Sequence, residues 1–295
     1  MDKILVYLRM TRPANVVTSV ADVLAGAAIA GFFSAEAFSG HILEIIMLCV
    51  STACLYGGGI VFNDVFDADL DKIERPERAI PSGRVSIKQA SIFGSVLLLT
   101  GTIIAALVSP VSGLLAFAIA FFALLYNKIA KHHYFWGPLN MGCCRGLNLL
   151  LGVSIITMAL SQWYFLAIVP IIYIFSITMI SRGEVHGGSR INLYIAAILY
   201  CIVTSFLLCF SYLNNKLLLS AIILIPFLWM IFRPLFKAIQ NPIGKNIGGA
   251  VKAGVISLIL MDATWAATFS NIYTAIIIAC LLPISLLLAK AFAVT

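Results

Sequence analysis

Residues 42–71, ILEIIMLCVSTACLYGGGIVFNDVFDADLD, join a long apolar run to a dense acidic cluster. The run from Ile42 to Phe62 is long enough for a helix that crosses a bilayer, which needs about 20 apolar residues. The stretch that follows, NDVFDADLD at 63–71, contains four aspartates and one asparagine. We therefore expect the acidic cluster to lie where a membrane-spanning helix reaches one membrane surface.

The whole chain repeats this pattern of apolar runs and short polar joints. Its 295 residues are 62% hydrophobic and 11% charged, whereas soluble domains are about 25% charged. This composition predicts an all-α integral membrane protein, a bundle of nine to ten transmembrane helices whose last span is the weakest. The expected spans are 15–34, 42–62, 90–108, 111–128, 141–160, 163–180, 192–212, 217–235, 249–269 and 272–290. The longest polar joint, 63–89, is too short to build its own core, so we expect a single membrane domain over residues 1–295.

Positive charge is distributed unevenly between the two sets of joints. Apart from Lys216 and Lys290, every lysine and arginine falls on the side that carries the N-terminus and the acidic cluster. Cytoplasmic loops carry the excess of basic residues, so we expect a multi-pass protein of the cell membrane with both features in the cytoplasm. The net charge of +7 then reflects topology, and it does not indicate a nucleic-acid partner.

The acidic cluster has helical spacing. On a helix, Asn63, Asp67 and Asp71 follow each other at i, i+4 and i+8, Asp64 lies beside them, and Asp69 points elsewhere. Carboxylates crowded on one face of a helix repel each other unless a cation neutralises them. Carboxylate and amide oxygens suit Mg²⁺, which commonly bridges one or two carboxylates to substrate phosphates. The face is therefore a candidate Mg²⁺ site.

Arginines follow the carboxylates directly in the segment ERPERAIPSGR. Arg75, Arg78 and Arg84 lie within a few turns of Asp71. A metal ion and arginines together can hold a diphosphate. The metal ion bridges the carboxylates to the phosphate oxygens, and the arginines donate charge-assisted hydrogen bonds to the diphosphate. The alternative is that the arginines neutralise the aspartates and anchor the joint to lipid headgroups.

Other polar residues on the same side are weaker candidates. Tyr126, Lys131, Asn140 and Arg145 can add donors around an anionic group, although basic residues here also satisfy the topology rule. The joint SRGEVHGGSR carries Glu184 and His186 among glycines that let a backbone approach a ligand. Glu184 and His186 are either a metal ligand and a base, or part of a flexible turn without a role in the site.

Two further acids, Asp22 and Asp262, lie inside expected spans, and neither has a basic partner in its own span. An ionisable residue at such a position is costly and usually faces the bundle interior or a cavity. Hydrogen bonding to Ser or Thr and a proton or substrate role are both open.

The motif NDxxDxxxD with the following RPxR and PSGR resembles the first aspartate-rich motif of the UbiA superfamily of intramembrane prenyltransferases, and Thr11 to Asn15, TRPAN, also fits that family. The resemblance implies a helical bundle, usually of nine spans, around a central cavity that opens laterally to membrane lipid. It also implies a prenyl diphosphate donor bound through Mg²⁺ and a small lipophilic or aromatic acceptor. Carried onto this chain, it implies metal ligands at Asn63, Asp67 and Asp71, support from Asp64, and diphosphate contacts from Arg75, Arg78, Lys131 and Arg145, with Tyr126 and Asn140 in the matching order.

The second aspartate-rich motif of that family is reduced in this chain. SRGEVHGGS offers a single acid, Glu184, as the remaining metal ligand, with His186 as a base, and it most resembles the divergent EboC branch. We expect Mg²⁺-dependent prenyl transfer in which Asp67, Asp71, Glu184 and His186 are the catalytic candidates. Two alternatives remain: a protein of the same fold that carries an isoprenoid or small metabolite without chemistry, and a transporter that uses Asp22 and Asp262.

Overall fold

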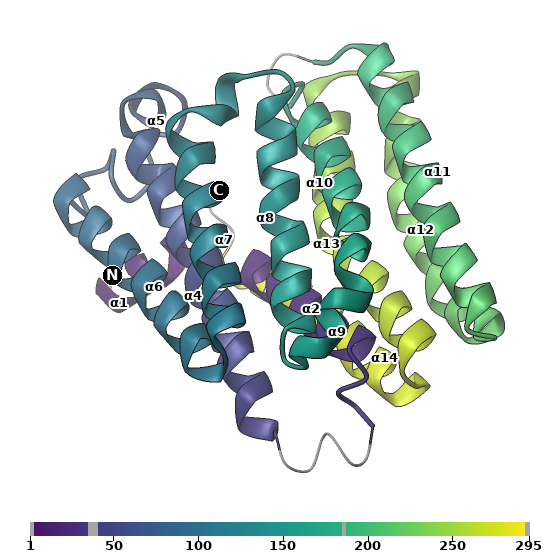
Figure 1. Ribbon diagram of the computed structural model, residues 1–295. Coiled ribbons are helices and arrows are strands. Elements are labelled where there is room, and N and C mark those ends of the chain that lie inside the picture. The colour runs from purple at the N-terminus through teal and green to yellow at the C-terminus, as the bar shows by residue number, and fades with distance from the viewer. Residues whose placement is uncertain (1–2, 35–40, 185–186, 293–295) are drawn as a thin grey trace.

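The computed structural model describes residues 3–34, 41–184 and 187–292, which form helices joined by short turns (Figure 1). The helices are α1 (Lys3–Met10), α2 (Pro13–Ile29), α4 (Ile42–Phe66), α5 (Ala68–Glu74), α6 (Ile87–Val108), α7 (Pro110–Lys128), η1 (Ala130–His132), α8 (Trp136–Val153), α9 (Thr157–Trp163), η2 (Tyr164–Ala167), α10 (Ile168–Ser181), α11 (Arg190–Leu213), α12 (Leu217–Gln240), α13 (Gly244–Phe269), α14 (Ile272–Ala279) and α15 (Leu281–Ala291). The all-α membrane bundle expected from hydropathy is confirmed.

Each of the ten predicted spans overlaps a helix, although 15–34 ends early because α2 stops at Ile29, and 141–160 crosses the break between α8 and α9. Within the described residues, eight helical segments are long and apolar enough to cross a membrane. One of the eight, Thr157–Ser181, combines α9, η2 and α10, and another, Ile272–Ala291, combines α14 and α15. The two remaining predicted spans are α2, which has 17 residues, and α8. α2 is apolar but short, whereas α8 is long enough and carries buried polar residues, Asn140, Arg145 and Asn148, that lower its hydropathy.

Local sequence signals set several helix ends. Ser86 and Gln89 form a reciprocal capping box at the start of α6. Ser109 caps α7, and Pro110 and Pro13 occupy the first turns of α7 and α2, where the missing N–H costs nothing. Because the joints are short, successive long helices run antiparallel to each other. The joints that follow α4, α7, α10 and α12 lie together at one end of the bundle (Figure 1).

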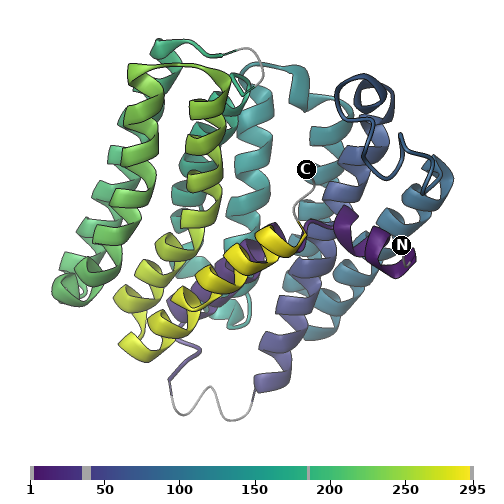
Figure 2. The ribbon, with the colours of Figure 1, turned by 180° about the vertical axis from the view of Figure 1, so that it is seen from behind.

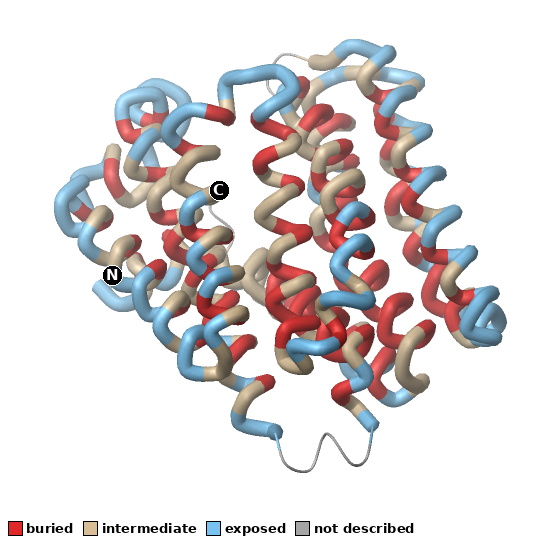
Figure 3. The backbone as a smooth tube through the Cα atoms, viewed as in Figure 1, coloured by how far each residue is buried: buried red, intermediate tan, exposed pale blue. Residues whose placement is uncertain are grey.

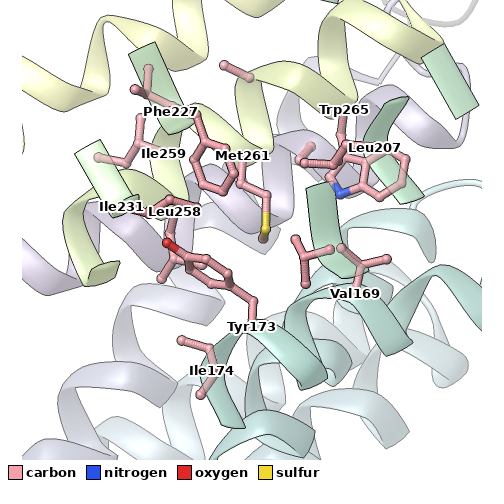
Figure 4. Packing of buried hydrophobic residues seen from close by; sticks show 14 of the residues in the cluster. Val169, Tyr173, Ile174, Leu207, Phe227, Ile231, Leu258, Ile259, Met261 and Trp265 are labelled. Atoms are coloured by element: carbon pink, nitrogen blue, oxygen red, sulfur yellow. The ribbon is translucent and has the colours of Figure 1, made fainter. Parts of the chain in front are cut away.

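Burial separates an inner from an outer surface. The outward faces of α6, α7, α11 and α12 are largely exposed, whereas the helices between them are mostly buried (Figure 3). α13 is the most buried of the eight membrane-crossing segments. Figure 4 shows its residues Met261 and Trp265 packed with Tyr173, Phe227 and Leu207 from three other helices. The exposed apolar faces are those expected to contact lipid.

Helices α2 and α8 pack in backbone contact. A Cβ atom at Gly26 would overlap the carbonyl oxygen of Leu149, and one at Gly152 would overlap the carbonyl oxygen of Val23. Small residues permit such close approach of membrane helices. Side chains that lie one or two turns from Gly26 on α2 are therefore held close to side chains one or two turns from Gly152 on α8.

The last two helices cover α2 from outside the bundle. α15 lies along α2 when the molecule is seen from behind (Figure 2), and the Ser285 hydroxyl donates to the carbonyl oxygen of Ala14 at 2.9 Å. α14 packs mainly on α13. The tenth predicted span is therefore broken near Cys280 into two helices that cover the seam between α2 and α13.

Candidate functional site

The acidic motif spans the end of one helix and the start of the next. α4 ends at Phe66, and Asp67 has φ −93° and ψ 4° before α5 begins at Ala68. The helical run over 63–71 is therefore interrupted at Asp67, because an aspartate easily leaves helical geometry. Backbone hydrogen bonds from Asp67 to Asn63 (3.0 Å) and from Asp71 to Asp67 (2.8 Å) bridge the break. The motif residues consequently remain on one side.

Two motif carboxylates share one arginine. Arg78 donates from Nη1 to Asp71 Oδ2 at 2.6 Å and to Asp64 Oδ1 at 3.3 Å, and Arg12 reaches the same Asp64 oxygen at 3.1 Å. The side chains of Arg78, Asp64 and Asp71 are only 12%, 11% and 4% exposed. The cluster is therefore a shielded network in which cations already neutralise the acids.

A second ion pair lies beside the first. Lys131, in η1, pairs with Asp67. The Asn63 amide donates to Asp67 Oδ2 and to Asn127 Oδ1, both at 3.1 Å. Asn127 in turn donates to the carbonyl oxygen of Gly59 at 2.9 Å. The predicted residues Asn63, Asp67 and Lys131 are thus brought together, although Asn127 and Lys131 each lie 64 positions after their partners on α4 and at its end.

Asp69 and Arg75 lie outside this network. Asp69 is 93% exposed and pairs with Lys72 at 2.7 Å, and this hydrogen bond lowers the pKa of its carboxyl. The expectation that Asp69 points away from the other acids is confirmed. Arg75 is exposed and is close enough to Glu184 to interact with it electrostatically.

Arg12 was not among the predicted site residues. It connects α1 to α2 and has a φ of 49°, a left-handed conformation that is uncommon for a residue with a side chain. Such strain persists where the surrounding structure over-determines it. The sequence signal was its place before Pro13 in the segment TRPAN, but its partner, Asp64, lies on another helix.

The joint after α10 brings Glu184 toward the same end of the bundle. Glu184 is half-buried, and burial raises the pKa of its carboxyl, while the Arg75 guanidinium acts in the opposite direction. Arg182 fixes the neighbouring joint by donating to the carbonyl oxygens of Lys131 (3.1 Å) and His133 (2.5 Å). The other candidate of this joint, His186, lies outside the described residues.

A cavity of about 360 Å³ extends inward from the acidic network. Its mouth is lined by residues that belong to the network or touch it: Arg12, Asn63, Tyr126 and Asn127. Its inner part is lined by Thr52, Tyr56, Arg145, Asn148 and apolar side chains from five helices. Tyr126 therefore lines the cavity as expected and interacts electrostatically with Asp67. Asn140 is buried in α8 and does not itself line the cavity, but it accepts a weak hydrogen bond at 4.0 Å from Cys144, which does.

Arg145 lies deeper than expected for a diphosphate ligand. Its guanidinium stacks 5.3 Å from the centre of the Tyr56 ring, and Tyr56 precedes Asn63 by seven residues, or about 10 Å of helix. Arg145 donates to Asp22 at 2.6 Å and to Thr18 at 2.5 Å. Asp22 therefore has a basic partner, supplied by another span, which weakens the transporter interpretation.

The network suits a magnesium ion bound together with a phosphate ligand. Within the described ranges, no group of three or more His, Cys, Asp or Glu side chains is close enough to hold a metal ion alone. Mg²⁺ is typically bound by one or two carboxylates plus substrate phosphates. Asp71 and Asp67 present carboxylate oxygens on one side, and Asn63 presents an amide oxygen, so the residues fit this mode of binding.

The sequence matches one protein family. The model of the UbiA prenyltransferase family covers residues 24–241. A digeranylgeranylglyceryl phosphate synthase of Ignicoccus hospitalis is 30% identical over 190 residues, which make up 63% of this chain and 59% of that protein. The match thus spans little more than half of that relative's length.

Solved structures share the fold. A structure of a digeranylgeranylglyceryl phosphate synthase has a TM-score of 0.67 at 20% identity, covering 92% of this chain and 100% of that chain. A UbiA homologue from Archaeoglobus fulgidus, bound to DMAPP and Mg²⁺, has a TM-score of 0.50 at 14% identity, covering 98% and 99%. These similarities confirm the helical bundle.

Proposed function

This chain belongs to the UbiA prenyltransferase family, and we propose that it transfers a prenyl group from a prenyl diphosphate to a small lipophilic or aromatic acceptor within the membrane. The observation that carries the proposal is the shielded network of Asp64, Asp67 and Asp71 with Arg78 and Lys131 at the mouth of a largely apolar cavity. It provides anionic and cationic groups side by side, as a metal-bound diphosphate requires.

Mg²⁺ would be held by Asp67 and Asp71, with Asn63, Asp64 and Glu184 as further candidates, and would neutralise charge on the diphosphate. The cations Arg12, Arg78 and Lys131 can then exchange their carboxylate partners for phosphate oxygens. In the reaction the allylic carbon–oxygen bond breaks with its electron pair going to the diphosphate. Cationic side chains stabilise this developing charge more in the transition state than in the ground state.

The cavity supplies the second half of the reaction. Its apolar lining accepts the prenyl chain and limits the access of water to the allylic cation. The acceptor forms the new bond to the allylic carbon and loses a proton, which the released diphosphate can take. We propose a single membrane domain over residues 1–295, with the N-terminus and the acidic network in the cytoplasm, supported by the basic joints at one end of the bundle.

A carrier that binds an isoprenoid without chemistry is the second candidate. The observation that favours it is the reduced joint after α10, where Glu184 is the single acid among residues 181–190. The same joint supports placement near the EboC branch of the family.

The test is turnover by the purified chain in detergent with labelled geranylgeranyl or dimethylallyl diphosphate, Mg²⁺ and a membrane lipid extract. We expect diphosphate release that falls about 100-fold in Asp67→Asn and Asp71→Asn. The matched control Asp69→Asn should keep it, because Asp69 is 93% exposed and pairs with Lys72 outside the network. Release that is unaffected by both substitutions would overturn transfer. Donor binding without release from any donor would favour the carrier.

A further inference from the structure

A charged cluster lies at the inner wall of the cavity, away from the acidic network at its mouth. It consists of Arg145 on α8, Asp22 on α2 and Asp262 on α13, which are 6%, 0% and 0% exposed. Of the three, Arg145 borders the cavity. The transfer chemistry at the mouth does not use this cluster, so its charge needs another explanation.

Hydrogen bonds hold the Arg145 guanidinium in one orientation. Nη1 donates to Asp22 Oδ2 at 2.6 Å and Nη2 donates to Thr18 Oγ1 at 2.5 Å. Asn148 donates to the same Asp22 oxygen at 2.8 Å and accepts from Thr52 at 2.6 Å. A guanidinium has more N–H donors than these two bonds use. Arg145 can therefore donate to a ligand in the cavity without giving up Asp22.

Asp262 is fully buried and lies close enough to Asp22 to interact with it electrostatically. In the described part of the chain, neither carboxylate oxygen of Asp262 has a hydrogen-bond partner. An ionised carboxylate without a partner is too costly to bury, so Asp262 is protonated and neutral. The cluster is then one guanidinium balanced by one negative charge, as burial inside a membrane protein favours.

A neutral cluster discriminates between ligands. A carboxylate or phosphate placed against Arg145 would add a negative charge that no other cation within the cluster balances, and burial of such a charge is costly. A hydroxyl, carbonyl or ether oxygen adds only a hydrogen-bond acceptor. The surrounding lining is compatible with a small ring, since Tyr56 and apolar side chains form the adjacent walls.

Arg145 lies far enough inside the cavity to contact a different part of the bound ligands than the mouth does. About 10 Å of helix lies between the level of Tyr56 and that of Asn63, so a diphosphate at the mouth does not contact Arg145. A ring-sized molecule with oxygens at both ends can reach from Arg145 toward the allylic carbon. We propose that Arg145, positioned by Asp22 and Thr18, determines acceptor specificity by binding the far end of a neutral, hydroxylated acceptor; this rests on the proposed function.

The test is equilibrium binding to the full chain in detergent, with Mg²⁺ and inorganic pyrophosphate present to occupy the mouth. The probes are 4-hydroxybenzyl alcohol, which is neutral, and 4-hydroxybenzoate, which is similar in size and anionic. We expect the neutral probe to bind at least about tenfold more tightly, and to lose about tenfold in Arg145→Lys, which has fewer donors. The matched control is Arg233→Lys, since Arg233 stacks on the exposed Trp229.

A second variant, Asp22→Asn with Arg145→Gln, keeps the cluster neutral and should fold while losing the same affinity. The proposal is overturned if the anionic probe binds as tightly as the neutral one, if the neutral probe does not bind, or if its affinity survives in both variants. Binding of Mg²⁺ and pyrophosphate to the unsubstituted chain is measured separately. Its absence would count against the proposed function, and its presence with failed discrimination would count against this inference alone.

Discussion

Arg145 on α8 donates from Nη1 to Oδ2 of Asp22 on α2 at 2.6 Å, and their side chains are 7% and 1% exposed. The two residues are 123 positions apart in the sequence. They meet because Gly26 and Gly152 let the backbones of α2 and α8 come into contact. The pair therefore depends on helix packing as much as it depends on charge.

Removal of one charge from this cluster should be costly. We expect Arg145→Met to destabilise the chain by about 3–5 kcal/mol, since it leaves an uncompensated buried negative charge. The double variant Asp22→Asn with Arg145→Met removes both charges and should recover most of the loss. Denaturant unfolding in detergent measures both. Equal stability of the single and the double variant would show that the pair is not coupled.

The contact between α2 and α8 can be tested through glycine. Gly152→Ala places a Cβ against the backbone of Val23, and overpacking of this kind costs about 1–3 kcal/mol. The matched control is Gly249→Ala on α13, where a Cβ meets no atom within 4 Å and alanine improves helix propensity by up to about 1 kcal/mol. Thermal unfolding should move in opposite directions for the two variants, and a Gly152→Ala chain as stable as the control would contradict the contact.

Arg78 should affect metal binding in two opposite ways. It pairs with Asp71 at 2.6 Å and with Asp64 at 3.3 Å, so without diphosphate it competes with a cation for these carboxylates. We expect Arg78→Ala to strengthen binding of Mg²⁺ alone and to weaken binding of Mg²⁺ with pyrophosphate by about tenfold or more, because a charge-assisted hydrogen bond is lost. Calorimetric titration separates the two effects.

The control for this prediction is Arg75→Ala. Arg75 is exposed and lies outside the ion-pair network with Asp64 and Asp71, so its removal should leave binding of Mg²⁺ alone unchanged. If Arg78→Ala changed the affinity for Mg²⁺ alone and for Mg²⁺ with pyrophosphate in the same direction, Arg78 would not be competing with the cation for these carboxylates.

Glu184 should give stability a specific pH dependence. Burial raises the pKa of its carboxyl in the folded chain above its ordinary value. A raised folded-state pKa means that the contribution of Glu184 to stability is fully present below the unfolded pKa and is lost as pH rises through the folded pKa. Without metal, Glu184→Gln should therefore unfold at a higher temperature than the unsubstituted chain at neutral pH.

The difference should disappear at pH values below the unfolded pKa, because the glutamate is then neutral in both states. Unfolding temperatures measured across this range test the sign. A Glu184→Gln chain that is less stable at neutral pH would show that the ionised carboxylate makes a favourable contact in the folded state, such as one with Arg75.

Much of the mouth of the site was predictable from local spacing. The i, i+4 and i+8 pattern of Asn63, Asp67 and Asp71 survives the helix break, because backbone hydrogen bonds continue across Asp67. Arg78 was predictable for the same reason, since it lies in the same joint as Asp71. Arg12 and Asn127 were missed, because their contacts with Asp64 and Asn63 cross between helices and leave no periodic signal.

The sequence by itself determined which segments enter the membrane and which end of the bundle collects acidic and basic residues. Hydropathy and charge are properties of contiguous residues, so they can be read without knowledge of packing. The tertiary structure alone decided that Asp22 pairs with Arg145, that Asp262 lies close enough to interact with both electrostatically, and that Arg145 lines the inner wall of the cavity. Those contacts join three helices through glycine-mediated packing of α2 on α8 and the close approach of α13, and no pattern within one segment specifies them.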